Sequence, residues 1–278
     1  MVFGNGPNAG APLVAHPDVP LVSFTGGTAT GQVIYKTCAA LNKKMSLELG
    51  GKNACIVFED ADLEDALVTV ARSCFANQGT CAFGNSSRGQ ICLCSSRIYV
   101  HASIYDQFLA GLKAKAEAII VGDPFDPQTQ MGPLVSAPHL EKVLSFVRLA
   151  AEEGGTIVTG GQRLESGIYK GGYYMRPTII SGVHPIDCRL QQEEIFGPVV
   201  TISSFDSEDQ VIQYANGTKY GLSACVWTQN LKRAHCVSRQ LQVNSVFLMT
   251  GGNYLGQLLD GKRSQYAFWR CQGLRTRS

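Results

Sequence analysis

Short apolar runs alternate along this chain with segments that carry the 3.6-residue period of amphipathic helices. The runs PLVSF, KMSLEL, ACIVF and SACVW predict strands at 20–24, 44–49, 54–58 and 223–227. Helices are predicted over residues 28–43, 62–77, 104–119, 138–153, 207–217 and 231–241. Because strands that alternate with helices form mainly parallel sheets, the sequence predicts an α/β fold.

Composition and charge argue against several classes of function. The 278 residues are 45% hydrophobic with a net charge of +2, which does not favour binding to nucleic acid or an anionic membrane. No apolar run approaches the roughly 20 residues of a membrane-spanning helix, and a secretory signal is not predicted. The ten cysteines are therefore expected to be reduced thiols in a cytoplasmic protein. Cys92 and Cys94 lack a second pair or a nearby histidine, so no metal site is predicted.

The stretch FTGGTATG, residues 24–31, leads from a predicted strand through two glycines into a predicted helix. Such a turn exposes backbone N–H groups at the positive end of a helix, where a phosphate binds. A tight turn without a ligand is the alternative, and the residues of the turn leave it open.

Glu48 lies near the end of an apolar strand in SLELGGKN, residues 46–53, and two glycines follow that let the backbone turn sharply. A carboxylate in apolar surroundings has a raised pKa and can act as a general base. The alternative is a solvated carboxylate at a strand end, which is common at such positions.

Cysteines cluster between residues 74 and 94. Cys74 falls on a predicted helix, where a buried small side chain is expected. Cys81, Cys92 and Cys94 lie in the loop beyond it, and each is a possible nucleophile in its thiolate form. Local physical chemistry does not rank these three thiols.

Three motifs together carry a resemblance to a known family. SLELGGKN, QICLC and QEEIFGPV, in this order, resemble the aldehyde dehydrogenase superfamily, and HPDVPLVSFTGGT agrees with it. The resemblance implies a Rossmann-type dinucleotide-binding domain, present here in part, and an α/β catalytic domain. It also implies oxidation of a small-molecule aldehyde to a carboxylic acid with NAD, NADP not being excluded, through a cysteine thiohemiacetal and a thioester.

The resemblance assigns roles to individual residues by their place in each motif. It implies that Glu48 activates water and that the pyrophosphate turn runs from Thr25 through Gly26 and Gly27 to Gly31. Glu194 would hold the nicotinamide ribose, and Phe196 would pack near the nicotinamide ring.

The cysteine motif of the family, FxNxGQxC, is interrupted in this chain. Phe75, Asn77 and Gly79 match it, whereas the ten residues TCAFGNSSRG at 80–89 do not. Without these ten residues the sequence reads FANQGQICLC, which matches the motif. The resemblance therefore implies that Cys92 is the nucleophile and that Cys81 belongs to an insert.

The resemblance divides the chain into three parts. It implies a partial dinucleotide-binding domain at 1–50, a catalytic domain at 51–242 and a divergent tail at 243–278, expected to be disordered. The N-terminal half of the family is not matched. With the insert, these departures predict an inactive chain. The alternative function is therefore an inert product or a non-catalytic partner of a full-length subunit.

Overall fold

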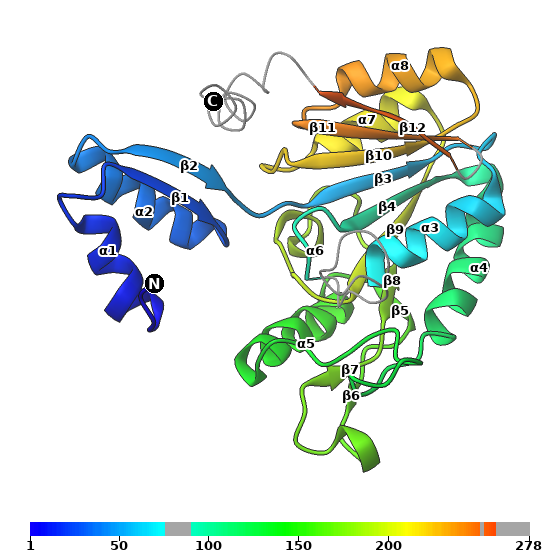
Figure 1. Cartoon of the computed structure of the whole chain (residues 1–278). Helices are drawn as coiled ribbons and strands as arrows, with labels where there is room; N and C mark the ends of the chain where they lie inside the picture. Colours follow the sequence, from blue (N-terminus) through cyan, green and yellow to red (C-terminus); the bar gives the residue numbers. More distant parts are fainter. Residues whose placement is uncertain (76–89, 251–252, 260–278) are drawn as a thin grey trace. The chain divides into compact units, whose positions relative to one another are not determined.

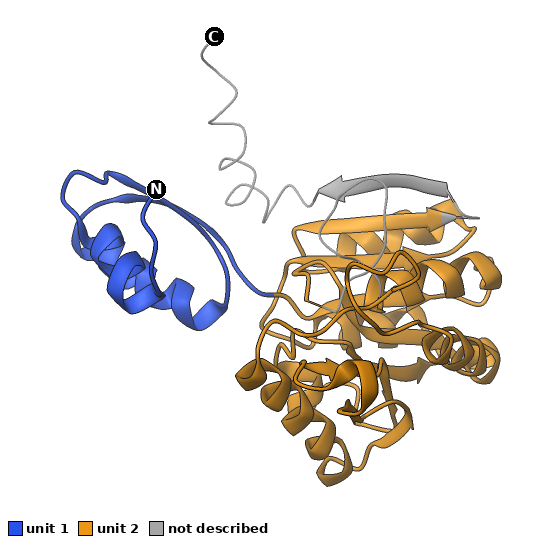
Figure 2. Ribbon diagram, turned by 60° about the horizontal axis from the view of Figure 1, so that its bottom comes forward, with its two compact units in different colours: residues 1–50, 268–278 blue, residues 51–267 orange. Residues whose placement is uncertain are grey.

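The computed structural model describes residues 1–75, 90–250 and 253–259, which fall into two compact units (Figures 1 and 2). Unit 1 comprises residues 1–50, and unit 2 begins at Gly51. The insert at 80–89 and the predicted end of a helix at Asn77 lie outside the described residues. Each unit is described by itself.

Unit 1 is a β-α-β unit with two short helical segments before it. Its elements are η1 Gly6–Gly10, α1 Ala11–Ala15, β1 Leu21–Thr25, α2 Thr28–Ala40 and β2 Lys44–Glu48. Strands β1 and β2 pair in parallel, as a helical crossover between adjacent strands requires. Val22, Ile34 and Cys38 are the buried side chains of its hydrophobic core.

Helix α2 ends at Ala40, three residues before the predicted end at 43. Asn42 has a left-handed backbone with φ 50°, and the Lys43 N–H donates to the Cys38 carbonyl at 2.9 Å. Asparagine tolerates this conformation, which closes a helix C-terminus and turns the chain toward β2.

Unit 2 is built on an eight-stranded sheet with the order β12-β11-β10-β3-β4-β9-β8-β5. The strands are β3 Asn53–Val57, β4 Ser95–His101, β5 Thr156–Thr159, β8 Thr178–Ser181, β9 Val199–Phe205, β10 Ser223–Trp227, β11 Ser245–Thr250 and β12 Asn253–Leu259. All neighbouring pairs from β11 to β8 are parallel, whereas β12 and β5 pair antiparallel at the two edges. The α/β prediction is confirmed.

Helices cover both faces of this sheet (Figure 1). The helices of unit 2 are α3 Leu63–Phe75, α4 Tyr105–Glu117, α5 Ala137–Glu152, α6 Arg189–Gln192, α7 Glu208–Asn216 and α8 Leu231–Gln240. Along β3, Cys55 and Val57 pack with α3 and α4, whereas Ala54 and Ile56 pack with α7 and α8. This alternation is the two-residue period of a strand that is buried on both faces.

Short elements complete unit 2: η2 Ala102–Ile104, η3 Gly167–Tyr169 and the hairpin of β6 Arg163–Leu164 with β7 Tyr174–Met175.

The helix signals in the sequence are confirmed at two termini. The Asp65 N–H donates to Asp62 Oδ1 at 3.1 Å, which is the predicted N-cap of α3. Helix α5 stops shortly before Gly154, which has a left-handed φ of 76°.

The expectation that disorder begins at residue 243 is wrong for β11. Ser245–Thr250 pairs in parallel with β10, and Val246 and Leu248 are buried in the core. The alternating residues of NSVFLM suit a strand with one face on α8, so packing and not motif content decides its structure. Residues 260–278 lie outside the described residues.

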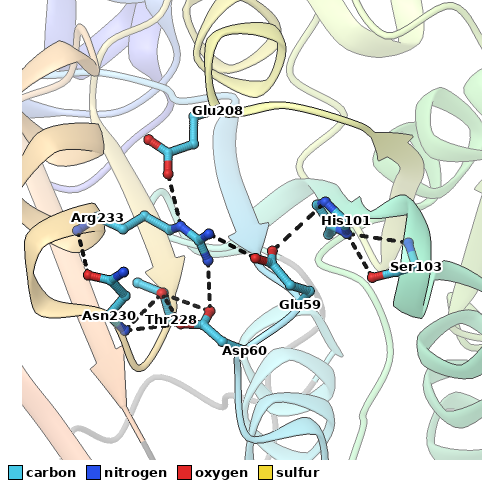
Figure 3. A network of polar contacts seen from close by, with 8 residues as sticks. All are labelled: Glu59, Asp60, His101, Ser103, Glu208, Thr228, Asn230 and Arg233. Carbon is cyan, nitrogen blue, oxygen red and sulfur yellow. Dashed lines mark hydrogen bonds and ion pairs between the residues drawn. The ribbon is translucent and has the colours of Figure 1, made fainter.

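Charged side chains tie α8 to the ends of β3 and β4 (Figure 3). The Arg233 guanidinium, 19% exposed, forms ion pairs with Glu59 at 2.8 Å, Asp60 at 3.1 Å and Glu208 at 2.9 Å. It also stacks over the Phe58 ring at 4.6 Å from the centroid.

No helix in the described part of the chain has the length and apolar character needed to cross a membrane.

Candidate functional site

Segments far apart in the sequence of unit 2 meet around one small cavity. Its lining includes Gly51 before β3, Cys92 and Cys94 before β4, and Glu194 and Phe196 between α6 and β9. Its volume is about 20 Å³, which is close to what one water molecule needs. The structure therefore brings together three of the residues singled out in the sequence, Cys92, Glu194 and Phe196.

Cys92 lies in a tight turn that runs directly into β4. The Cys94 N–H donates to the Ile91 carbonyl at 3.1 Å and closes the turn. The amide nitrogen of Asn53 donates to the Cys92 carbonyl at 2.7 Å and to the Cys94 carbonyl at 3.0 Å. Asn53 was not identified as a site residue from the sequence, although it is the last residue of the SLELGGKN motif.

Cys74 is buried on α3, as predicted, and it also lines the cavity beside Cys92. Its thiol donates to the Ser95 carbonyl at 3.0 Å. Burial raises the pKa of the Cys74 thiol well above its usual value, which disfavours the reactive thiolate. Cys92 is half-buried, whereas Cys81 lies outside the described residues.

Glu194 and Phe196 are held by hydrogen bonds from Gly51, before β3, and from α5. The Gly51 N–H donates to Glu194 Oε1 at 3.0 Å. Lys142 donates to the Glu194 carbonyl at 3.0 Å, and the His139 Nε2 bonds the Phe196 carbonyl at 2.7 Å. Phe196 itself has φ 60°, which is strained for a residue with a Cβ.

Two buried basic residues, Lys52 and Arg97, lie close together near the start of β3, and the sequence did not predict them as site residues. Lys52 is 1% exposed, and burial, with repulsion from Arg97, lowers its pKa from 10.5 to about 7. Its Nζ has no hydrogen-bond partner in the described part of the chain. Arg97 donates to the carbonyls of Lys52 and Ala215 at 2.8 Å each. A lysine with this pKa is partly neutral at physiological pH.

The glycine-rich turn and Glu48 belong to unit 1. Thr25 pairs with Glu48 across β1 and β2, and the Gly26 N–H donates to the Glu48 carbonyl at 3.0 Å. The Glu48 side chain is exposed in this structure. This environment corresponds to a solvated strand-end carboxylate and not to the apolar surroundings expected for a general base.

The turn also leaves backbone N–H groups at the start of α2 without a side-chain cap. Gly27 is the N-cap residue and supplies no side-chain acceptor, while Gly31 packs against Leu49 inside the unit. The Thr28 hydroxyl is buried without a partner in the described residues. Unsatisfied donors at a helix N-terminus, with an unpaired hydroxyl beside them, suit an anionic group.

A metal centre finds no support in the described parts of either unit. No group of three or more His, Cys, Asp or Glu side chains there could hold a metal ion.

Comparison with known proteins identifies the family. The model of the aldehyde dehydrogenase family matches residues 1–254, so the chain belongs to this family. The match extends beyond Gln242, where the motif resemblance stops. The chain is 46% identical to 2-aminomuconic semialdehyde dehydrogenase of Danio rerio over 255 residues, 89% of this chain and 49% of the relative. It is also 46% identical to 2-hydroxymuconic semialdehyde dehydrogenase of Pseudomonas sp. strain CF600, covering 89% of this chain and 50% of that protein.

Solved structures agree with this assignment. A betaine aldehyde dehydrogenase of Staphylococcus aureus in complex with NAD+ has a TM-score of 0.83 at 34% identity, covering 95% of this chain and 53% of that one. An aldehyde dehydrogenase of Bacillus cereus, also in an NAD+ complex, has a TM-score of 0.81 at 37% identity, covering 92% and 50%. The chain thus spans about half the length of the relatives it matches.

Proposed function

We propose that this chain carries the aldehyde-oxidising chemistry of its family, with Cys92 as the nucleophile. The observation that carries the proposal is the convergence of Cys92, Glu194 and Phe196 on one cavity, although the first two are far apart in the sequence. The relatives' names suggest an unsaturated dicarboxylic semialdehyde as the first substrate class to test.

The proposed cofactor is NAD, with NADP as the alternative. Residues 1–50 would contribute part of its binding domain, with the turn from Thr25 to Gly31 at the pyrophosphate. The unsatisfied donors at the start of α2 and the unpaired Thr28 hydroxyl support this fit. Glu194 would hold the ribose, and Phe196 would pack near the nicotinamide. When bound, the cofactor supplies a hydride acceptor.

Residues 51–242 would provide the nucleophile Cys92, and residues 1–50 would provide Glu48. The Cys92 thiolate attacks the aldehyde carbon and forms a thiohemiacetal, and loss of hydride from that carbon gives a thioester. By its place in the family motif, Glu48 would accept a proton from the water that hydrolyses the thioester. The products are the carboxylic acid and the regenerated thiol of Cys92.

The ten residues at 80–89 are proposed to suppress turnover without preventing the fold around Cys92. The thiol of Cys74, near the end of α3, bonds the Ser95 carbonyl at 3.0 Å, so residues that flank the interrupted motif on its two sides are in contact. A loop insertion adds only about 0.6 kcal/mol per doubling of loop length. Catalysis is less tolerant, since an error of about 1 Å can cost on the order of a hundredfold in rate.

The test compares the full chain with a variant that lacks residues 80–89, using muconic semialdehyde and NAD. We expect the deletion to raise the rate of reduced-cofactor formation, and Cys92→Ser to abolish it in both backgrounds. Cys94→Ser is the matched control and should retain activity. If activity in the full chain survives Cys92→Ser but is lost in Cys81→Ser, then Cys81 and not Cys92 is the nucleophile. Equal rates with and without the insert would show that it has no effect on catalysis.

A non-catalytic partner of a full-length subunit is the second candidate, and an apolar groove in unit 1 favours it. The groove has a volume of about 690 Å³ and is lined by α1, β1 and α2, with Leu13, Leu21 and Val33 about half exposed or more. Large exposed apolar surfaces of this kind favour association. Co-expression with a full-length relative should then give a mixed oligomer by native mass spectrometry.

A cytoplasmic location is part of the same proposal. Cys38, Cys55, Cys74, Cys188, Cys225 and Cys236 form no disulfide within the described parts of the chain. Reduced cysteines in this number are typical of a reducing compartment.

A further inference from the structure

The Asn53 side chain joins three segments of unit 2 at the start of β3. It is 3% exposed, and its amide nitrogen donates to the carbonyls of Cys92 at 2.7 Å and Cys94 at 3.0 Å. Its Oδ1 accepts from the Ser223 N–H at 3.1 Å. Both amide hydrogens and the carbonyl oxygen are therefore used, which ties the Cys92 turn to β3 and β10.

Gly51, two residues earlier, contacts both sides of the same site. Its N–H donates to Glu194 Oε1 at 3.0 Å. A Cβ at this position would lie 2.8 Å from Asn53 Oδ1 and 3.0 Å from the Cys92 carbonyl oxygen, so the segment packs directly on the turn. Residues 51–53 thus contact the Glu194 carboxylate at one end and the backbone of Cys92 at the other.

We propose that Asn53 is the positioning residue that fixes Cys92 relative to Glu194. An amide at this position satisfies two backbone carbonyls of a half-buried turn and so holds the turn against β3. Its consequence for catalysis rests on the proposed function, whereas its effect on the Cys92 turn does not.

Aspartate is the most informative replacement because it is isosteric and reverses the hydrogen bonding. In Asn53→Asp one carboxylate oxygen still accepts from the Ser223 N–H, whereas the oxygen that replaces the amide nitrogen faces the Cys92 and Cys94 carbonyls without a donor. In Asn53→Ala all three hydrogen bonds of the side chain are lost. In Asn53→Ser a shorter donor remains, which makes this variant the conservative one.

Asn216 is a matched control elsewhere in unit 2. Its amide nitrogen donates to the Gln240 carbonyl at 2.9 Å, and its Oδ1 accepts from the Gln242 N–H at 2.7 Å. Its side chain therefore bridges two backbone segments as Asn53 does, but it does not line the Cys92 cavity. Asn216→Ala removes comparable bonds without touching the proposed site.

The experiment measures alkylation of each cysteine by iodoacetamide in the full chain, resolved by peptide mass spectrometry. We expect Asn53→Ala to speed alkylation of Cys92 at least about fivefold relative to exposed Cys236, because the turn opens when its hydrogen bonds are lost. Buried Cys55 and Cys74 report on unfolding and should stay protected. Asn53→Ser should fall between Asn53→Ala and the parent, and Asn216→Ala should match the parent.

In the variant without residues 80–89, Asn53→Ala should lower kcat about tenfold or more while the KM for NAD changes little. An unchanged Cys92 alkylation ratio in Asn53→Ala and Asn53→Asp overturns the proposal. If Cys55 and Cys74 also become reactive in Asn53→Ala, that variant has unfolded, and Asn53→Ser is used in its place. A rate of Cys92 alkylation in Asn53→Ser equal to that of the parent would then overturn the proposal. A parent without aldehyde oxidation but with the expected alkylation pattern contradicts the proposed function and leaves the role of Asn53 standing.

Discussion

At the scale of single residues, the strain at Phe196 can be separated from the role of its ring. Phe196 has φ 60°, and its carbonyl is held by the His139 side chain at 2.7 Å. A left-handed backbone costs a residue with a Cβ about 1 kcal/mol more than it costs glycine.

We therefore expect Phe196→Gly to be more stable than Phe196→Ala by about 1 kcal/mol, although both lose the same ring. Urea denaturation of the two variants measures the difference. A more stable Phe196→Ala would show that the backbone there relaxes without cost.

Lys52 should make the stability of unit 2 depend on pH. Its pKa falls from 10.5 to about 7 on folding, mainly through burial. Between these two pH values Lys52 binds a proton in the unfolded chain but not in the folded chain. The contribution of Lys52 to the free energy of unfolding therefore rises with pH across this window. Below pH 7 the buried ammonium is charged and costs free energy.

Lys52→Met should accordingly raise the free energy of unfolding at pH 6 by on the order of 2 kcal/mol and remove part of the rise above pH 7. Denaturation at several pH values tests this, with exposed Lys170→Met as the control. A parallel pH dependence in Lys52→Met and the parent would contradict it.

At the scale of elements, the Arg233 network anchors α8 to β3. One guanidinium pairs with three carboxylates, from Glu59, Asp60 and Glu208, and it is largely buried against Phe58. Arg233→Met leaves partly buried carboxylates without a counter-charge, so we expect a loss of about 2 kcal/mol.

Arg233→Lys should recover little of this loss, because a single ammonium cannot bond three carboxylates in the same geometry. Arg148→Met is the matched control, since the Arg148–Glu141 pair is more than half exposed and should contribute about 0 to 1 kcal/mol. Thermal unfolding of unit 2 compares the three variants, and equal losses for Arg233 and Arg148 would contradict the prediction.

At the scale of the whole molecule, the two units should differ strongly in stability. The core of unit 1 is built on Val22, Ile34 and Cys38, whereas three larger clusters stabilise unit 2. A unit of about 50 residues buries a small fraction of its surface and is only marginally stable by itself. We therefore expect amide hydrogens of β1 and α2 to exchange at least about a hundredfold faster than those of β3 and β4.

Hydrogen exchange with mass spectrometry measures this in the full chain. Equal protection in the two units would mean that unit 1 is stabilised by contacts beyond its own core.

Local patterns in the sequence determined the long helices and the strands β1, β2, β3 and β10, whereas β4, β5, β8 and β9 were not predicted. Asp62 caps α3, Gly154 follows the end of α5, and apolar periodicity predicts the helices around them. These signals act between residues a few positions apart, so they can be recognised without the fold. The motifs likewise determined the identities of Cys92, Glu194 and Phe196 as candidates, because chemistry needs particular residue types.

Tertiary structure alone decided how these residues meet. The Gly51 N–H reaches a carboxylate 143 residues away, and the Asn53 amide reaches carbonyls 39 and 41 residues away. Both contacts depend on β3 lying between β10 and β4, an order that local periodicity does not encode. The same holds for β11, which lacks the family motif but completes the sheet because its alternating side chains find a buried face beside β10.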